Sequence, residues 1–254
     1  MKALIFFIIL YIPLISFSSQ VQLTVALGET DYPPFYFVQD GKYYGSSLEI
    51  AEAVAKRLDI ELVYERYPWS RVLKNLETGT VDMVIHFFNT PERASSVIHT
   101  GVPHIFESSY LFVRENSDIV FDGDLKKLQQ YDISNISGYS HGKDYDNANY
   151  LNKMPVSAED NLVNMLIRNR FDIAVGNKPT ILMSAKKDGI DDKIKFLTPI
   201  IDEGPCYMAF SRIKPNSKAL AAMFTEEIIE FKKTDEYKNI LKKYNFDFPV
   251  FNPL

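Results

Sequence analysis

Short apolar runs and longer helical periods follow one another along the first half of the chain. Residues 81–87 are mostly apolar and rich in β-branched side chains, which predicts a buried strand, and two further strands are predicted at residues 23–27 and 60–64. Apolar residues recur at helical spacing over residues 46–58, and a second helix is predicted over residues 71–76. The repeated order of strand, loop and helix predicts an α/β fold with a mainly parallel sheet and helices on both faces.

A similar unit recurs in the second half of the chain. Residues 76–85 (LETGTVDMVI) and 166–175 (LIRNRFDIAV) each combine a helix end, a turn and a short strand with aspartate in second place. This repeat suggests two lobes of one architecture. We expect strands at residues 110–114 and 206–212 to lie side by side between the lobes as a hinge. The predicted division is residues 21–113 plus 206–254 for lobe 1, and 114–205 for lobe 2.

Three loops follow the three predicted strands and carry candidate ligand-binding side chains. Tyr32 follows the first strand, Trp69 the second and Arg93 the third. Threonine is common at the N-cap of a helix and proline at its first position. Thr90 and Pro91 therefore predict that Arg93 lies in the first turn of a helix. Ligands bind at this edge of open α/β sheets, and a guanidinium pairs with a carboxylate through two hydrogen bonds. The alternatives are that Tyr32 covers the sheet edge, that Trp69 is a core residue and that Arg93 lies on a solvated helix face.

The N-terminus has the pattern of an export signal. Lys2 precedes an apolar run at residues 3–17, and serines follow it, so we predict a signal peptide over residues 1–18. A membrane anchor is the alternative, but Pro13 interrupts the run, and a span needs about 20 apolar residues. Cys206 is the only cysteine, which excludes an internal disulfide. An exported chain without disulfides favours the periplasm of a Gram-negative bacterium.

Composition narrows the classes of function. Net charge is −5 and there is no run of basic residues, so we expect no nucleic-acid partner. The glycine-bracketed turn at residues 138–142 suits an anion but lacks the lysine of a phosphate loop. The histidines lack the close helical spacing of zinc ligands, so we expect neither a metal nor a cofactor. They are His86, His99, His104 and His141.

Several motifs together resemble the family 3 extracellular solute-binding proteins, which are periplasmic receptors for polar amino acids in ABC import. These motifs are Tyr32-Pro33-Pro34-Phe35, Gly45 before Leu48-Glu49-Ile50-Ala51, Trp69, Gly79-Thr80-Val81-Asp82 and Thr90-Pro91-Glu92-Arg93. The resemblance implies a two-lobed, type II periplasmic-binding-protein clamshell with two hinge strands. It also implies a monomer, a small carboxylate-bearing ligand and an ABC permease in the inner membrane as partner.

The resemblance assigns roles to individual residues. Arg93 would grip the ligand α-carboxylate, and Trp69 and Tyr32 would stack on the ligand. The turn that contains Ser140 would offer hydrogen bonds to the same carboxylate from the second lobe.

The chain departs from the family pattern at three places. Asn177 stands where an aspartate usually holds the ligand ammonium group, and Glu29 stands where the first loop often has aspartate. His86 and Phe87, with the phenylalanine after them, replace small polar residues. A neutral amide gives up most of a charge-assisted hydrogen bond. Asn177 therefore predicts weak binding of ordinary α-amino acids, unless Glu29 reaches the ligand, and better binding of acids with an apolar body.

Two other functions compete with a binding receptor. Some proteins of this fold dehydrate cyclic acids, and His86, Glu29 and Glu49 could supply acid–base groups. A stand-alone sensor or accessory binding protein without a transporter is the other alternative. We expect a binding protein rather than an enzyme, because the sequence shows no pairing of a nucleophile with a base.

Overall fold

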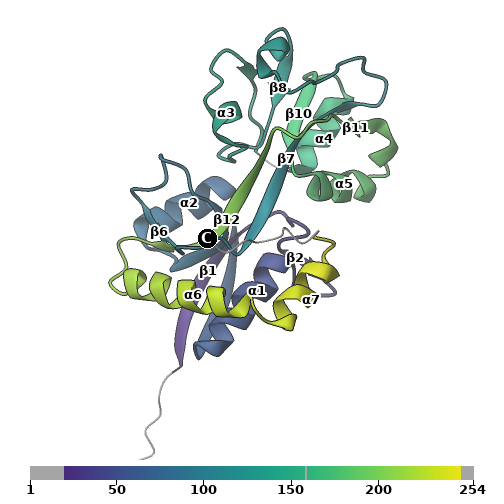
Figure 1. Ribbon diagram of the computed structural model, residues 1–254. Helices are drawn as coiled ribbons and strands as arrows, with labels where there is room; N and C mark the ends of the chain where they lie inside the picture. Colours follow the sequence, from purple (N-terminus) through teal and green to yellow (C-terminus); the bar gives the residue numbers. More distant parts are fainter. Residues whose placement is uncertain (1–19, 158, 247–254) are drawn as a thin grey trace, which may run out of the picture.

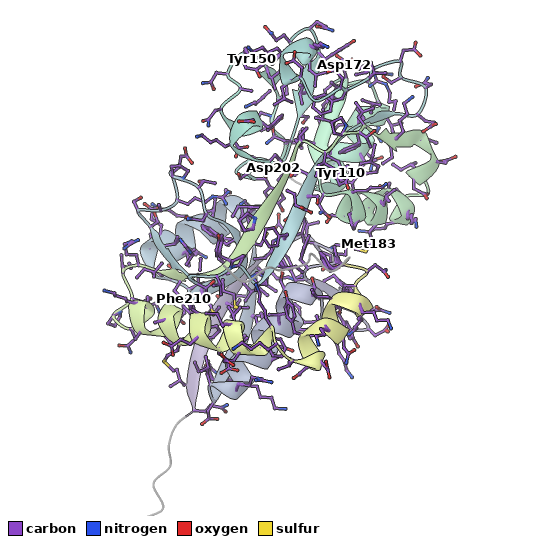
Figure 2. All side chains as sticks on the ribbon, viewed as in Figure 1. Tyr110, Tyr150, Asp172, Met183, Asp202 and Phe210 are labelled. Carbon is purple, nitrogen blue, oxygen red and sulfur yellow. The ribbon has the colours of Figure 1, made fainter. Side chains whose placement is uncertain are left out.

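Two ten-residue strands run side by side and join two α/β lobes (Figure 1). The computed structural model describes residues 20–157 and 159–246, so the predicted signal peptide lies outside the described residues. The joining strands are β7 (Ile105–Arg114) and β12 (Asp202–Ser211). Figure 2 labels Tyr110 on one and Asp202 on the other. The two lobes and the hinge strands confirm the predicted fold class.

The first lobe is a sheet in the order β4-β1-β5-β12, with helices on both faces. Strands β1, β4 and β5 are parallel, and β12 is antiparallel to β5. Along β1, Val25 and Leu27 pack toward α1, α6 and α7, whereas Ala26 packs toward α2. Burial on both faces explains why this strand is a continuous apolar run. The elements are β1 (Val21–Gly28), β2 (Phe37–Gln39), β3 (Lys42–Tyr44), α1 (Ser46–Arg57), β4 (Ile60–Tyr67), α2 (Trp69–Thr78), β5 (Met83–Phe88), β6 (Val97–His99), α6 (Ser217–Phe231) and α7 (Asp235–Lys243).

The second lobe is smaller and is built on β10, β8 and β9 beside the far half of β7. Two apolar clusters fill it, and both include residues of β7 and β10. In the part of the chain that the structure describes, no helix has the length and apolar character to cross a membrane. The elements are η1 (Leu125–Leu128), β8 (Asp132–Ser134), α3 (Lys143–Asp146), β9 (Asn152–Lys153), α4 (Glu159–Ile167), β10 (Ile173–Gly176), α5 (Lys178–Lys187), η2 (Asp191–Lys193) and β11 (Ile194–Phe196).

The hinge strands pair through different residues from those predicted. Residues 105–109 of β7 pair with 202–206 of β12, whereas the predicted runs, 110–114 and 206–212, mostly enter the sheets of the lobes. The predicted runs are the apolar halves of each strand, because those halves are buried in the lobe cores. Residues 111–113 belong to the cores of the second lobe. We therefore propose that the first crossover lies near Ser109 rather than at residue 113.

The internal repeat corresponds to a repeated structural device. Thr24 N donates to Asp82 Oδ2 over 2.8 Å in the first lobe. Asp132 N donates to Asp172 Oδ2 over 3.1 Å in the second. In both lobes the aspartate before a strand accepts a backbone N–H of a parallel strand, which explains why the same sequence pattern occurs twice.

The helix predicted around Arg93 is absent from this described segment. Residues 91–96 form successive turns, and β6 begins immediately afterwards at Val97. Arg93 N donates to Thr90 O over 3.0 Å, so the local geometry starts like a helix. The six residues before β6 leave room for little more than a turn.

Gly45 fixes the loop that carries Tyr32 against the start of α1. Its φ is 134°, and a Cβ there would lie 2.2 Å from Phe35 O. We expect Gly45→Ala to lower the free energy of unfolding by about 3 kcal/mol, because it combines backbone strain with a clash against main chain. Gly41→Ala is the matched control. Gly41 has φ 72° but no atom within 4 Å of its Cβ position, so Gly41→Ala should lower the free energy of unfolding by about 1 kcal/mol only. Urea denaturation measures both variants, and equal losses would contradict the clash.

Candidate functional site

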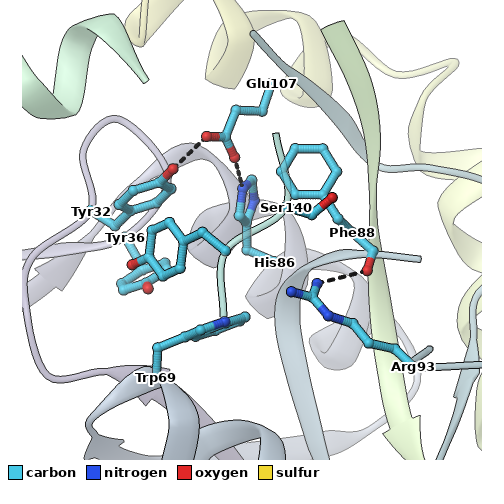
Figure 3. Close-up of a pocket in the computed structure, with 9 residues that line it drawn as sticks. Tyr32, Tyr36, Trp69, His86, Phe88, Arg93, Glu107 and Ser140 are labelled. Atoms are coloured by element: carbon cyan, nitrogen blue, oxygen red, sulfur yellow. Dashed lines mark hydrogen bonds and ion pairs between the residues drawn. The ribbon is translucent and has the colours of Figure 1, made fainter. Parts of the chain in front are cut away.

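A small cavity lies where the two lobes meet (Figure 3). Its volume is about 30 Å³, which is room for about one or two water molecules. The lobes therefore leave little space between them beside Arg93. The lining residues are Tyr32, Tyr36, Trp69, His86, Phe88, Arg93, Glu107, Tyr139 and Ser140.

Arg93 places a half-buried cation at this cavity. Its Nη1 donates to Phe88 O over 2.9 Å, and its Nη2 donates to Gly138 O in the other lobe over 2.6 Å. The guanidinium carbon lies 5.1 Å from the centre of the Phe87 ring. Burial lowers the pKa of Arg93 from its ordinary value. A desolvated cation that is bound to neutral carbonyls is a favourable place for a ligand carboxylate.

Aromatic side chains from both lobes fill most of the space beside Arg93. The Tyr139 ring packs edge-on against Tyr32, with centroids 5.8 Å apart, and against Trp69, with centroids 5.6 Å apart. Trp69 Nε1 donates to Gly138 O over 3.2 Å. Because Tyr139 belongs to the second lobe, it leaves this position if the lobes move apart. A ligand that stacks on Tyr32 and Trp69 would take its place.

A buried chain of hydrogen bonds forms another wall of the cavity. Tyr32 Oη donates to Glu107, and Glu107 Oε2 lies 2.7 Å from His86 Nε2. His86 Nδ1 lies 2.9 Å from Ser47 Oγ, which lies 2.8 Å from His104 Nε2. A neutral His86 can donate to Glu107 and accept the Ser47 hydroxyl proton. Burial lowers the pKa of His104 well below its ordinary value, so this end of the chain is uncharged near neutral pH.

The structure brings five of the predicted site residues around one cavity and leaves three outside its lining. Those at the cavity are Tyr32, Trp69, His86, Arg93 and Ser140. Phe87 points into the core under α2, and its neighbour Phe88 lines the cavity instead, because side chains alternate along a strand. Glu29 is exposed, and its backbone N–H bonds to Tyr67 O over 2.8 Å.

Asn177 has a structural role that explains its side chain. Its Oδ1 accepts from Thr180 N over 3.3 Å at the start of α5, and its Nδ2 donates to Ser108 O over 3.2 Å. It lines a second cavity, which shares Glu107 with the Arg93 cavity but does not include Arg93. The prediction that Asn177 faces the ligand of Arg93 is therefore not supported by this geometry.

Sequence reasoning missed Glu107, Tyr139, Tyr36 and Phe88. A signal for Glu107 exists in the strand pattern. Glu107 has the same parity as Leu111 and Val113 in β7, and all three are buried. Alternation along a strand predicts that such residues face inward. A glutamate on the inward-facing side of a strand is unusual, and this marks Glu107 as a candidate site residue.

His141 should make the fold sensitive to acid. Burial lowers the pKa of His141 to about 4, and its Nδ1 bonds to Ser109 Oγ over 3.1 Å. The unfolded side chain titrates near its ordinary pKa of about 6.5, so the unfolded state binds the proton more strongly. The stability contribution is thus present above pH 6.5 and is lost as pH falls toward 4. The charged groups near His141 are Asp146, Glu107, Lys153 and Arg93.

We expect His141 alone to lower the free energy of unfolding by about 2 kcal/mol between pH 7 and pH 5. His141→Gln should reduce this pH dependence by that amount, whatever its effect at pH 7. Urea unfolding at both pH values measures the difference. The same change in stability in both proteins would show that His141 titrates normally in the fold.

Two α/β lobes, two hinge strands and an interlobe cavity with a cation and aromatic walls define a clamshell binding protein. Residues 23–247 match the profile of the bacterial extracellular solute-binding proteins, family 3, and the chain belongs to this family.

Known relatives agree with this class. The chain is 22% identical to the probable amino-acid-binding protein YxeM of Bacillus subtilis, over 83% of this chain and 79% of that protein. It is 25% identical to a probable histidine-binding protein of Campylobacter jejuni, over 89% and 86% of the two chains. An ancestral arginine-binding protein bound to glutamine has a similar fold, with a TM-score of 0.74 at 21% identity over 89% and 98% of the chains. A histidine kinase sensor domain has a TM-score of 0.76 at 20% identity over 88% and 95%.

Proposed function

We propose that the protein is a periplasmic receptor that captures a small carboxylate-bearing solute, an amino acid in the first instance, and delivers it to an ABC permease. The observation that carries this proposal is the cavity that combines the Arg93 guanidinium, the Glu107 carboxylate and aromatic walls. Membership of a family of extracellular solute-binding proteins supports the receptor class. The export pattern at the N-terminus supports the compartment.

Arg93 is the proposed partner of the ligand carboxylate. It now donates to Gly138 O across the cleft, and that bond breaks when the lobes separate. A carboxylate can replace this carbonyl and accept two parallel hydrogen bonds from the guanidinium. Ser140 lines the same cavity from the second lobe. Its hydroxyl donates a hydrogen bond to Asp146, and this bond fixes the turn that faces the ligand.

Glu107 is the proposed partner of the ligand ammonium group. Among the described residues it is the one acidic side chain that lines the Arg93 cavity. Tyr32 and His86 hold its two oxygens, and a carboxylate has lone pairs for further donors. Glu107 can therefore take the role that the family pattern gives to the Asn177 position. This revises the expectation that ordinary α-amino acids bind weakly.

Opening of the lobes must precede binding. Cavities that hold small ligands are about 300–1,000 Å³, far above the 30 Å³ of the cavity beside Arg93. We expect hinge motion about β7 and β12 to admit the ligand and closure to follow. Small-angle X-ray scattering should show a smaller radius of gyration with a saturating ligand than without it. An unchanged radius, with binding confirmed by calorimetry, would count against the clamshell.

A thermal-shift screen over amino acids, amines and organic acids tests the proposed function as a whole. A ligand at about a hundred times its dissociation constant stabilises the folded state by about 2.7 kcal/mol, which such a screen detects. Stabilisation by amino acids or organic acids is the expected result. Stabilisation by amines alone would overturn the carboxylate assignment. A permease and an ATPase encoded beside this gene would support a transport role over a stand-alone sensor.

An enzyme is the second candidate, and the buried Glu107–His86 pair is the observation that favours it. Both side chains line the cavity and lie 2.7 Å apart, so they could pass a proton to a bound acid. The other acid–base residues named from the sequence lie elsewhere. Glu29 is exposed, and Glu49 bonds to Lys243 over 2.6 Å. Chromatography of cyclic hydroxy acids after incubation would reveal dehydration. Turnover that disappears in Glu107→Gln would support the enzyme.

A further inference from the structure

Three potential metal ligands converge behind the wall of the cavity. His86 on β5, Glu107 on β7 and Cys206 on β12 offer a nitrogen, an oxygen and a sulfur that all lie within 4.8 Å of one another. The exposed fractions of these residues are 7%, 4% and 0%. Their strands are neighbours in the order β5-β12-β7. The backbone of three adjacent strands therefore holds the three side chains together.

The separation of the nitrogen and sulfur ligands suits a tetrahedral ion. Zinc binds nitrogen at about 2.0 Å and thiolate sulfur at about 2.3 Å, which separates two tetrahedral ligand atoms by about 3.5 Å. Cys206 Sγ lies 3.5 Å from His86 Nε2. Glu107 Oε2 is closer to this nitrogen, at 2.7 Å, and would move back by less than about 1 Å as the ion replaces their hydrogen bond.

Neighbouring side chains already orient two of the three ligands. Ser47 Oγ lies 2.9 Å from His86 Nδ1 and can accept a hydrogen bond from a proton on that nitrogen. In this tautomer the Nε2 lone pair is available for an ion. Tyr32 Oη donates to the other oxygen of Glu107. Partners of this kind commonly accompany metal ligands. Cys206 belongs to the apolar core of the first lobe, as buried cysteines often do, and its Sγ also lies 3.5 Å from His86 Nε2.

We propose that His86, Glu107 and Cys206 bind one divalent transition-metal ion, with Zn²⁺ as the best match to a nitrogen, oxygen and sulfur set. Three protein ligands leave a fourth position for water or for a group in the cavity. The ion and a ligand ammonium group would compete for Glu107, so Zn²⁺ should weaken amino-acid binding. The site goes beyond the proposed receptor function and does not depend on it. Sequence spacing hides it, because the ligands come from three distant strands.

Metal titration of the chelator-stripped protein tests the proposal. Calorimetry with Zn²⁺, followed by dialysis and elemental analysis, should give one ion per chain. Co²⁺ should produce a thiolate-to-cobalt charge-transfer band in the near ultraviolet, and this measurement on the unmodified protein does not depend on any variant folding. We expect Cys206→Ser and Glu107→Gln each to weaken Zn²⁺ binding by about tenfold or more.

Two control variants separate this cluster from other metal-binding groups. His99 bonds to Asn89 and Thr100 outside the cluster, and Glu203 is exposed on β12. His99→Gln and Glu203→Gln should bind Zn²⁺ like the unmodified protein. Failure to retain an ion, or a Co²⁺ spectrum without the thiolate band, would overturn the proposal. So would Zn²⁺ affinity that survives Cys206→Ser. A negative result would leave amino-acid capture at Arg93 untouched, because the thermal-shift screen is done without metal.

Discussion

Arg93→Ala is expected to abolish capture of the solute and to leave the fold intact. In the closed cleft the ligand carboxylate loses its water, and a buried carboxylate without a paired cation is costly. The loss should be about 3–5 kcal/mol, or roughly two to four orders of magnitude in affinity. Arg93→Lys should also bind poorly, because an ammonium group cannot reproduce the planar fork. Isothermal titration calorimetry with the best ligand of the screen measures both variants.

Arg71→Ala is the matched control for Arg93. Arg71→Ala removes the same charge as Arg93→Ala. Arg71 is exposed on α2 of the same lobe and does not line the cavity. Its affinity should equal that of the unmodified protein. Full affinity in Arg93→Ala would show that the carboxylate binds elsewhere.

Glu107→Gln is expected to change which ligands bind. In the metal-free protein it should weaken α-amino acids by about 1.5–3 kcal/mol, the contribution of a charged hydrogen bond, and should spare acids that lack the amino group. Glutamine has nearly the same shape. Its side-chain oxygen can still accept the hydrogen bond from the Tyr32 hydroxyl. Its amide N–H can donate to His86 Nε2 when the His86 proton is on Nδ1. Calorimetry with matched pairs of amino acids and deaminated acids measures this discrimination.

Asn177→Asp is the informative counterpart of Glu107→Gln. The family pattern alone predicts that this change improves amino-acid binding. The structure predicts little change, because Asn177 caps α5 and does not line the Arg93 cavity. A shift toward amino acids in Asn177→Asp, without a loss in Glu107→Gln, would reverse the two assignments.

The sequence predicts those parts of the fold and site that depend on local pattern. Continuous apolar runs mark strands that are buried on both faces, and loops at strand ends carry Tyr32, Trp69 and Arg93 to one cavity. His86 and Phe87 are both predicted as site residues, but neighbouring residues of a strand face opposite sides, so His86 and Phe88 line the cavity while Phe87 is buried in the core.

The remaining features depend on how distant segments meet. Tyr139 reaches the cavity only because the second lobe lies against the first, and Cys206 meets His86 only through the strand order β5-β12-β7. Neither fact is visible in local spacing. Asn177 shows a different limit. It stands at the sequence position where the family usually has a ligand-binding aspartate, but its side chain caps α5.

A calorimetric comparison of three related ligands on the metal-free protein tests whether Arg93 and Glu107 together bind an α-amino acid. They are the best α-amino acid of the screen, the same molecule without its amino group and the same molecule without its carboxylate. Both trimmed molecules should bind more weakly by about tenfold or more, because Glu107 and Arg93 each lose a charged partner. Binding of the amine without a carboxylate as tightly as the complete amino acid would contradict this assignment.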